Sequence, residues 1–345
     1  MFAGGMPLLR PPQAAATSLP MSRLRSLLAT LRIANAPSVV SNVWLGYALG
    51  WALNSTVFGM PDAPPLARTS PFLLCLAGLL LYFAGNLAND WYDRTWDAVR
   101  RPERALPSGL FAPWKFIAAS VLLAVGGVML AFTAGVPCGA CALVILAAIA
   151  IYTRIHKVTI ASVIPMGLCR AGLYFLGFLG TSPDPRLVEL AGLDAAGYSM
   201  GTLLTLVPLA IGLFCYIAGL SLSARYEGMS NPPRVPHLVS RALLVVPIFA
   251  MSFIFMERPL QGLAGSIPYV IWLAMSLTWF RTPIPRYVSA LLAGIPLVDF
   301  IAAAPLVLLS KGFNAGGGIS PMITLLLPLV AFVFGRALQK LAPAT

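Results

Sequence analysis

The sequence predicts an all-α fold, a polytopic bundle of nine to ten transmembrane helices. Hydrophobic residues make up 59% of the 345 residues and charged residues only 10%, whereas a soluble domain carries about 25% charged residues. The mean hydropathy is +0.85. Apolar runs of about 20 residues, long enough to cross the hydrocarbon core, recur along the chain. Each run is expected to be a helix, because backbone groups cannot remain unpaired in lipid.

Ten segments carry this pattern and are the expected membrane spans. In chain order they are 38–58, 70–88, 113–135, 138–153, 159–180, 200–222, 237–256, 262–280, 286–310 and 319–338. Residues 1–22, rich in Ala, Pro and Gly, are expected to be a disordered cytoplasmic segment. Residues 23–340 are then one transmembrane domain.

The net charge is +12, and the basic residues are distributed along the chain as the expected topology requires. With ten spans and both termini in the cytoplasm, 18 of the 23 basic residues fall inside and 4 outside, and Arg170 lies within a span. The four outer residues are Arg68, Arg186, Arg258 and Lys311. This asymmetry is the positive-inside pattern of integral membrane proteins. The basic excess therefore predicts orientation and attraction to membrane lipid, and gives no evidence for nucleic acid.

A cluster of acids follows the second apolar segment. Only 11 residues of the chain are acidic, yet Asp90, Asp93 and Asp97 fall within eight positions, directly after Asn89. Their spacing places them on one face of a helix and its continuation, at what we expect to be an exposed polar surface. Carboxylate oxygens suit Mg²⁺, which completes its coordination with water and substrate phosphates. The alternative is a solvated, salt-bridged loop, but the concentration of so scarce a residue type favours a metal site.

Basic residues follow the acids and strengthen this interpretation. Arg94, Arg100, Arg101 and Arg104 lie within the next few positions. Guanidinium groups match the geometry of phosphate oxygens. Together the acids and the arginines predict a site for a metal ion and a phosphate at the membrane surface.

Two strings in this region resemble the first signature of the UbiA superfamily of intramembrane prenyltransferases. They are Asn-Asp-x-x-Asp-x-x-x-Asp at 89–97 and Arg-Pro-x-Arg-Ala-Leu-Pro-Ser-Gly at 101–109. Further parts agree in order: Arg32 and Pro37 introduce the first span, and the segment 152–157 has the spacing Tyr-x-x-x-x-Lys. The resemblance covers about residues 24–310.

The resemblance implies an enzyme that moves a prenyl group, or a related diphosphate-activated group, from an isoprenoid diphosphate to a lipid-soluble acceptor. Asp90, Asp93 and Asp97 would hold Mg²⁺ and serve as the catalytic carboxylates on the cytoplasmic side of an inner or plasma membrane. Seven further residues would bind the substrate: Asn89, Arg32, Arg101, Arg104, Lys157, Arg225 and Glu227. Aromatic residues of the spans, among them Tyr82, Phe83, Tyr174, Phe175 and Tyr216, are assigned to packing or interfacial anchoring and left out of the site.

One departure from the family pattern bears on which donor the protein would use. The second aspartate motif, expected after the sixth span, is replaced by Ser-Leu-Ser-Ala-Arg-Tyr-Glu-Gly at 221–228, where Glu227 is the remaining acid. Either Arg225 contacts phosphate in place of a metal ion, or the donor is not an ordinary prenyl diphosphate. A UbiA-like branch transfers a phosphoribosyl group, and another accompanies the ebo operon. In a third interpretation, catalysis is lost and the fold binds or transports a lipid.

Two charged residues fall within apolar segments. Asp299 lies in the ninth segment and Arg170 in the fifth, where charges are costly and usually face a cavity or a partner. Asp299 is either functional or one member of a local polar pair, and Arg170 is a candidate for phosphate or partner binding. A secondary transporter would also place ionisable groups near the middle of the membrane. Because most acids gather at one surface instead, the transferase is favoured.

Overall fold

The computed structural model describes residues 23–58, 69–182, 194–225, 234–252, 259–309 and 319–342, and residue 189. These residues form helices joined by short connections, and no strand occurs among them. The helices are α1 (Arg23–Thr30), η1 (Ile33–Asn35), α2 (Ala36–Phe58), α3 (Pro71–Arg100), α4 (Pro113–Thr133), α5 (Val136–Ile155), η2 (Ile160–Ser162), α6 (Val163–Leu179), α8 (Ala195–Arg225), α9 (Arg234–Ser252), α10 (Pro259–Ala264), α11 (Ile267–Thr278), α12 (Ile284–Leu309) and α14 (Pro321–Leu341). The predicted N-terminal segment 1–22 and Glu227 lie outside the described residues.

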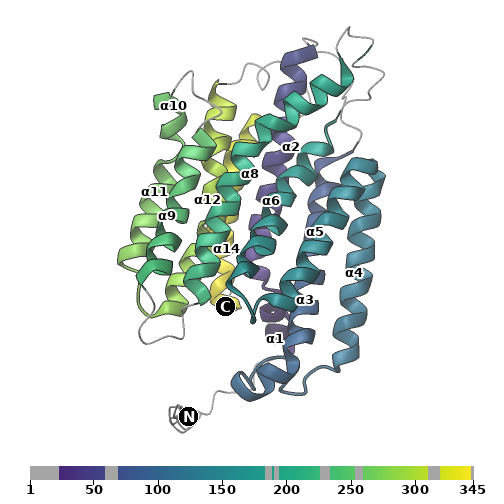
Figure 1. Ribbon diagram of the computed structural model, residues 1–345, viewed down its shortest axis with the longest axis vertical. Helices are drawn as coiled ribbons and strands as arrows, with labels where there is room; N and C mark the ends of the chain where they lie inside the picture. Colours follow the sequence, from purple (N-terminus) through teal and green to yellow (C-terminus); the bar gives the residue numbers. More distant parts are fainter. Residues whose placement is uncertain are drawn as a thin grey trace, which may run out of the picture.

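The predicted all-α membrane fold is confirmed. The long helices run side by side, with α4 at one edge of the bundle and α9 to α11 at the other (Figure 1). Among the described residues, seven helices are long and apolar enough to cross a membrane, and 238–251 and 267–278 are shorter apolar helices. Each of the ten predicted segments coincides with helical structure, but the number that span the membrane stays a prediction.

The predicted segment 262–280 differs from the expectation, because it is divided between α10 and α11 at Gly265 and Ser266. Gly265 lies so close to α12 that a Cβ there would stand 2.7 Å from the carbonyl oxygen of Ile301. Pro268, in the first turn of α11, lacks the N–H needed to continue a helix from the residues before it. Close packing and proline together explain the break.

Helix α3 carries the acidic cluster and is longer than its apolar segment. It begins at Pro71, where the Ser70 side chain caps the N–H of Phe72, and continues to Arg100. Thirty residues make a helix of about 45 Å, against a hydrocarbon core of about 30 Å. The last turns, with all three aspartates, therefore extend the helix beyond the apolar part of the bundle.

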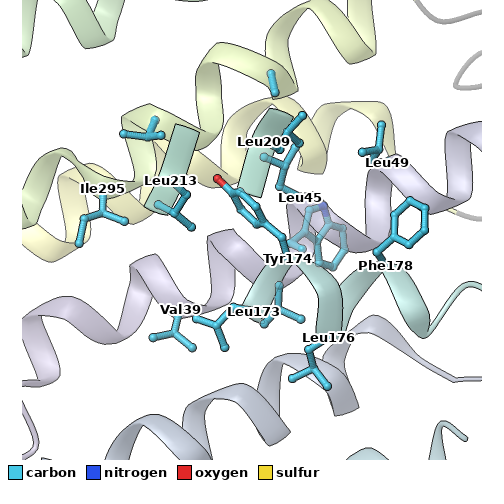
Figure 2. Packing of buried hydrophobic residues seen from close by; sticks show 14 of the residues in the cluster. Val39, Leu45, Leu49, Leu173, Tyr174, Leu176, Phe178, Leu209, Leu213 and Ile295 are labelled. Carbon is cyan, nitrogen blue, oxygen red and sulfur yellow. The ribbon is translucent and has the colours of Figure 1, made fainter. Parts of the chain in front are cut away.

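Helices α2, α6 and α12 form the centre of the bundle. α12 is the most buried of the candidate spans, and α2 packs against α3, α6, α12 and α14. α2 and α6 approach each other closely at two glycines. A Cβ on Gly177 would stand 2.0 Å from the carbonyl oxygen of Val43, and one on Gly46 would stand 2.1 Å from that of Tyr174. Figure 2 shows Tyr174 among the apolar side chains that fill this region.

The polar ends of several helices meet at one end of the bundle. Arg25 Nε donates to the carbonyl of Leu341, which brings the end of α14 beside α1 (3.1 Å). At the same end, ion pairs of its aspartates join α3 to Arg32 in the turn before η1 and to Lys157 in the loop after α5. Three basic residues that the charge pattern assigns to the cytoplasm, Arg25, Arg32 and Lys157, are therefore at this end of the bundle.

Candidate active site

A cavity of about 440 Å³ opens at this polar end and extends between the helices. Its walls come from α3, α5, α6, α8, α12 and the turn before α2. Its charged lining residues lie mainly toward the loops, while Leu81, Ile145, Ile149, Met166 and Leu173 line the part between the helices. The cavity therefore combines a charged mouth with an apolar interior.

Asp90 and Asp97 are held by two arginines. Arg104 Nη1 lies 2.9 Å from Asp97 Oδ2 and 3.6 Å from Asp90 Oδ1, and Arg32 Nη2 lies 3.7 Å from the same Asp90 oxygen. Arg104 follows the end of α3, so the chain turns back and places its guanidinium against the last turns of that helix. Burial lowers the pKa of Arg32, but Asp90 and weaker neighbouring groups raise it, and the net shift is upward. The Arg32 guanidinium is therefore firmly cationic.

Both the side chain and the backbone of Arg32 are hydrogen-bonded to α3. Its Nη1 donates to Asn86 Oδ1 (2.7 Å), and its carbonyl accepts a hydrogen bond from the Tyr82 hydroxyl (3.0 Å). The residue has the left-handed backbone conformation, with φ of 47°, at the turn that precedes η1. This turn and the two hydrogen bonds direct the guanidinium toward Asp90.

Asp93 has different partners, which come from the loop after α5. Lys157 Nζ lies 2.7 Å from Asp93 Oδ1, and His156 Nε2 lies 3.1 Å from Asp93 Oδ2. Lys157 also lies over the ring of Trp96, 4.0 Å from its centroid. The ammonium group of Lys157, the last residue of the Tyr-x-x-x-x-Lys segment, is thus in direct contact with α3.

Arg225, at the end of α8, contacts the same loop. Its Nη1 donates to the carbonyls of His156 (3.0 Å) and Thr159 (2.9 Å). The guanidinium therefore holds the backbone on either side of Lys157 while it lines the cavity. Arg225 stands where the family places its second aspartate motif, and here it fixes the position of a loop.

The oxygen atoms near Asp90 fit a divalent cation. Within the described structure, Asn89 Oδ1 is buried and makes no hydrogen bond, and Asp90 Oδ1 has only the longer ion-pair contacts to Arg32 and Arg104. Buried oxygens normally have closer partners. In the part of the chain that the structure describes, no three Asp, Glu, His or Cys side chains converge on one point. Mg²⁺ does not require such a cluster, because it is commonly held by one or two carboxylates together with substrate phosphates and water.

The structure brings most of the predicted site residues to the cavity. Those that line it are Arg32, Asn89, Asp93, Asp97, Arg101, Arg104, Lys157 and Arg225. Asp90 lies behind the lining, paired with Arg32 and Arg104. The expectation that the three aspartates are exposed is wrong, because they are only 2–8% exposed. The helix continues through them, and the basic residues of two loops cover them.

Several lining residues were not predicted from the sequence. His156, Asn35, Asn86, Trp96 and Tyr152 line the cavity, and so does Arg170, which was only a weak candidate. His156 stands directly before Lys157, so the Tyr-x-x-x-x-Lys segment could have indicated it. Of the five aromatic residues assigned to packing, Tyr82 alone is among the described lining residues.

The chain was also compared with known proteins. Over 127 residues it is 33% identical to a digeranylgeranylglyceryl phosphate synthase of Methanothrix thermoacetophila, an alignment that covers 36% of this chain and 48% of the relative. Over 188 residues it is 32% identical to the synthase of the same name from Halobacterium salinarum, covering 54% of this chain and 61% of the relative. The matched region thus spans about half to three fifths of these relatives.

Solved structures with a similar fold include one described as giving insights into the biosynthesis of digeranylgeranylglyceryl phosphate synthase in membranes. It has a TM-score of 0.48 and 17% identity, and the match covers 82% of this chain and 99% of that one. A UbiA homolog from Archaeoglobus fulgidus, bound to DMAPP and Mg²⁺, has a TM-score of 0.43 and 14% identity, with 91% and 99% covered.

The model of the UbiA prenyltransferase family matches residues 43–292, which is most of the chain. This region contains the acidic helix α3, the Lys157 loop and the end of α8. Because seven helices in the described part of the chain are suited to cross a membrane, the protein is an integral membrane protein. The chain belongs to the UbiA prenyltransferase family.

Proposed function

We propose that this protein transfers an isoprenyl group from its diphosphate to a lipid-soluble acceptor, in a reaction that requires Mg²⁺. The observation that carries the proposal is the cavity itself, whose charged mouth and apolar interior match the two ends of an isoprenoid diphosphate. Family membership and the names of the curated relatives support the same reaction class. Because those relatives are named for a digeranylgeranylglyceryl product, geranylgeranyl diphosphate is the first donor to test.

The cations at the mouth supply the binding site for the diphosphate. Arg32, Arg101, Arg104 and Lys157 line the cavity within reach of the acidic turns of α3. Arg104 and Lys157, which are paired with carboxylates, are placed to donate to phosphate oxygens as well. When the bond between C1 and oxygen breaks, the diphosphate keeps the electron pair, and these cations stabilise the charge that develops there.

Asp90, Asn89 and Asp93 are the residues that would hold Mg²⁺. Two of them carry buried oxygens without a hydrogen bond, and Asp93 lines the cavity. A bound Mg²⁺ would supply further neutralisation of the diphosphate. This placement uses few protein ligands and leaves the rest of the coordination shell to phosphate and water.

The apolar interior accommodates the isoprenyl chain. Leu81, Ile145, Ile149 and Met166 exclude water from the allylic carbon. The acceptor nucleophile forms its bond to C1 as the diphosphate leaves, and it releases a proton. The positive-inside pattern supports a cytoplasmic mouth, so that a water-soluble diphosphate and Mg²⁺ would enter from the cytoplasm.

Purified protein in lipid nanodiscs tests the proposal directly. Geranylgeranyl, farnesyl and geranyl diphosphates are each offered with a total membrane lipid extract, in Mg²⁺ or in EDTA, and products are identified by mass spectrometry. We expect a prenylated lipid and inorganic diphosphate in Mg²⁺, and neither in EDTA. Tight donor binding without any product would favour the alternative, a UbiA-like protein that only binds or transports an isoprenoid lipid.

A further inference from the structure

A network of polar side chains lies deep in the bundle, apart from the acidic cluster. It connects α2, α6 and α12. The Asp299 carboxylate accepts hydrogen bonds from the hydroxyls of Tyr174 (2.5 Å) and Ser41 and from the Asn42 amide (2.8 Å). The side chains of Ser41, Asn42, Tyr174 and Asp299 are completely or almost completely buried. Figure 2 shows Tyr174 of this network among apolar residues.

Arg170 is the member of this network that reaches the cavity. Its Nη1 donates to Ser38 Oγ (2.9 Å) and to Asn42 Oδ1 (3.3 Å), and the residue is 8% exposed and lines the cavity wall. All of its hydrogen bonds to described residues come from this one nitrogen. Nε and Nη2 therefore remain available on a charged group that is nine-tenths buried.

The place of Arg170 differs from that of the other lining cations. Its guanidinium carbon lies 5.3 Å from the centroid of the Tyr82 ring. Tyr82 precedes Asp93 by eleven residues on α3, which corresponds to about 16 Å along the helix axis. Arg170 is also at the start of the third turn of α6, beyond the loop that carries Lys157. It therefore lies further toward the apolar interior than Lys157, beside the Tyr82 side chain whose hydroxyl donates to the Arg32 carbonyl.

A second polar group stands on the same wall. Asn35 lines the cavity and is 5% exposed, and its Oδ1 has no hydrogen-bond partner within the described structure. The Ser38 hydroxyl, which accepts from Arg170, donates to the Asn35 carbonyl (2.6 Å). Arg170 and Asn35 are thus neighbours through Ser38, and both have unused hydrogen-bonding capacity.

An ion pair with Asp299 does not explain why the charged Arg170 side chain is buried here. The two side chains form no ion pair within 4.0 Å, and the Asp299 oxygens are taken by Ser41, Asn42 and Tyr174. Asn42 stands between them, accepting from Arg170 and donating to Asp299. This arrangement holds the guanidinium in place and leaves two of its nitrogens for another group.

We infer that Arg170 and Asn35 form a second binding point in the cavity, which recognises an anionic oxygen group of the lipid-soluble acceptor. The inference rests on the proposed transfer reaction. A phosphate monoester or a carboxylate would satisfy the free Nε and Nη2 in a fork geometry, in surroundings of low dielectric. Asn35 would complete the recognition by donating from its amide nitrogen, since the amide oxygen can only accept. The acceptor would then be oriented separately from the donor, whose diphosphate is held at the mouth.

Binding of simple amphiphiles to the full chain tests this inference. The protein is purified in a neutral detergent, and the donor end is first filled with geranyl thiolodiphosphate and Mg²⁺, whose own affinity is recorded. Dodecyl phosphate, dodecanoate and dodecanol are then titrated, using tryptophan fluorescence. We expect one or both anionic probes to bind at least tenfold more tightly than dodecanol, and the stronger one identifies phosphate or carboxylate as the recognised group. In R170Q the advantage should disappear while the thiolodiphosphate affinity stays within twofold of wild type.

One control variant and two replacement variants make the result decisive. R286Q removes an arginine that does not line the cavity, and it should bind all probes like wild type. If R170Q does not fold, N35L and R170K replace it, with an expected loss of threefold or more of the anion preference. Equal binding of anionic and neutral probes by the wild type, or an unchanged preference in R170Q (or in both replacements), would overturn the inference. Failure to bind geranyl thiolodiphosphate at all would instead count against the proposed function.

Discussion

Each of the three aspartates is paired with at least one basic residue. Asp97 and Asp90 share Arg104, and Asp93 is paired with Lys157 and His156. Mutual repulsion of three carboxylates on one helix face is thereby relieved before any metal ion arrives. The same pairs fix the cations to which the proposed diphosphate donor would bind, so the site is preorganised by its own ion pairs.

Asp93 offers the cleanest single substitution, because it lines the cavity and joins α3 to the Lys157 loop. Asp93→Asn should reduce Mg²⁺-dependent prenyl transfer at least 100-fold, since a preorganised charge at the reacting centre is lost. Asn has nearly the same shape, so folded protein measured by size-exclusion chromatography should be retained. The exposed acid of the neighbouring turn provides the control, and Glu103→Gln should keep wild-type turnover. Turnover of Asp93→Asn within threefold of wild type would remove this residue from the site.

Arg225 is expected to act through the loop that it holds. Because its Nη1 donates to the carbonyls of His156 and Thr159, Arg225→Ala should weaken donor binding several-fold by releasing Lys157. In a double-mutant cycle, Arg225→Ala combined with Lys157→Ala should be no weaker than Lys157→Ala alone. Independent, additive losses of donor affinity would show instead that the guanidinium contacts the donor directly.

The sequence indicated the charged residues of the site but not their pairing. Asp93 and Arg104 could be selected from the acidic cluster and the arginines after it, and Lys157 from the Tyr-x-x-x-x-Lys spacing of 152–157. That Arg104 turns back onto Asp97, and that Arg225 holds a loop, depends on where separate helices end relative to one another. Such long-range geometry leaves no periodic signal in the sequence.

At the scale of the elements, the contact between α2 and α6 depends on glycine. Gly177→Ala should destabilise the protein by about 1–3 kcal/mol, because its Cβ would stand 2.0 Å from the Val43 carbonyl oxygen. Gly126→Ala is the matched control, since its nearest neighbour would be a leucine methyl at 3.8 Å. Thermal unfolding in detergent measures both. Equal midpoints for the two variants would contradict the close approach of these helices.

Helix α14 tests the predicted topology. It packs against α12 and α2, and its last residues reach Arg25, so the C-terminus lies at the same end as the start of α1. Reporter fusions after residue 312 and after residue 345 should therefore report opposite sides of the membrane, with residue 345 in the cytoplasm. If both fusions report the same side, α14 does not span and the number of spans is one fewer.

The apolar pattern predicted the existence of the helices well and their ends less well. Each expected segment contains helix, because burial in lipid leaves the backbone no alternative. The spacing of the aspartates predicted that the helix continues through them, but its end at Arg100 and the break between α10 and α11 were not predicted. Both depend on contacts with other elements: loop cations covering the aspartates in the first case, and close packing of Gly265 on α12 in the second.

At the scale of the whole molecule, the bundle separates two chemical environments along one cavity. Cations and carboxylates from the ends of α3, α5 and α8 gather at the mouth, and apolar side chains of α3, α5 and α6 line the interior. A water-soluble head and a lipid-soluble chain can therefore be bound at once. The family membership that two motifs predicted is confirmed. The chain lacks the second aspartate motif of the family, and at that position Arg225 holds the loop that carries Lys157.

The central claim is that this mouth binds an isoprenoid diphosphate together with Mg²⁺. The most direct measurement is a titration of the purified protein with the non-reactive geranylgeranyl thiolodiphosphate, in Mg²⁺ and in EDTA, by isothermal calorimetry. We expect micromolar or tighter binding in Mg²⁺, a loss of at least tenfold in EDTA, and a similar loss in Asp93→Asn with Mg²⁺ present. Binding that is equally tight with and without Mg²⁺, and unchanged in Asp93→Asn, would contradict the account.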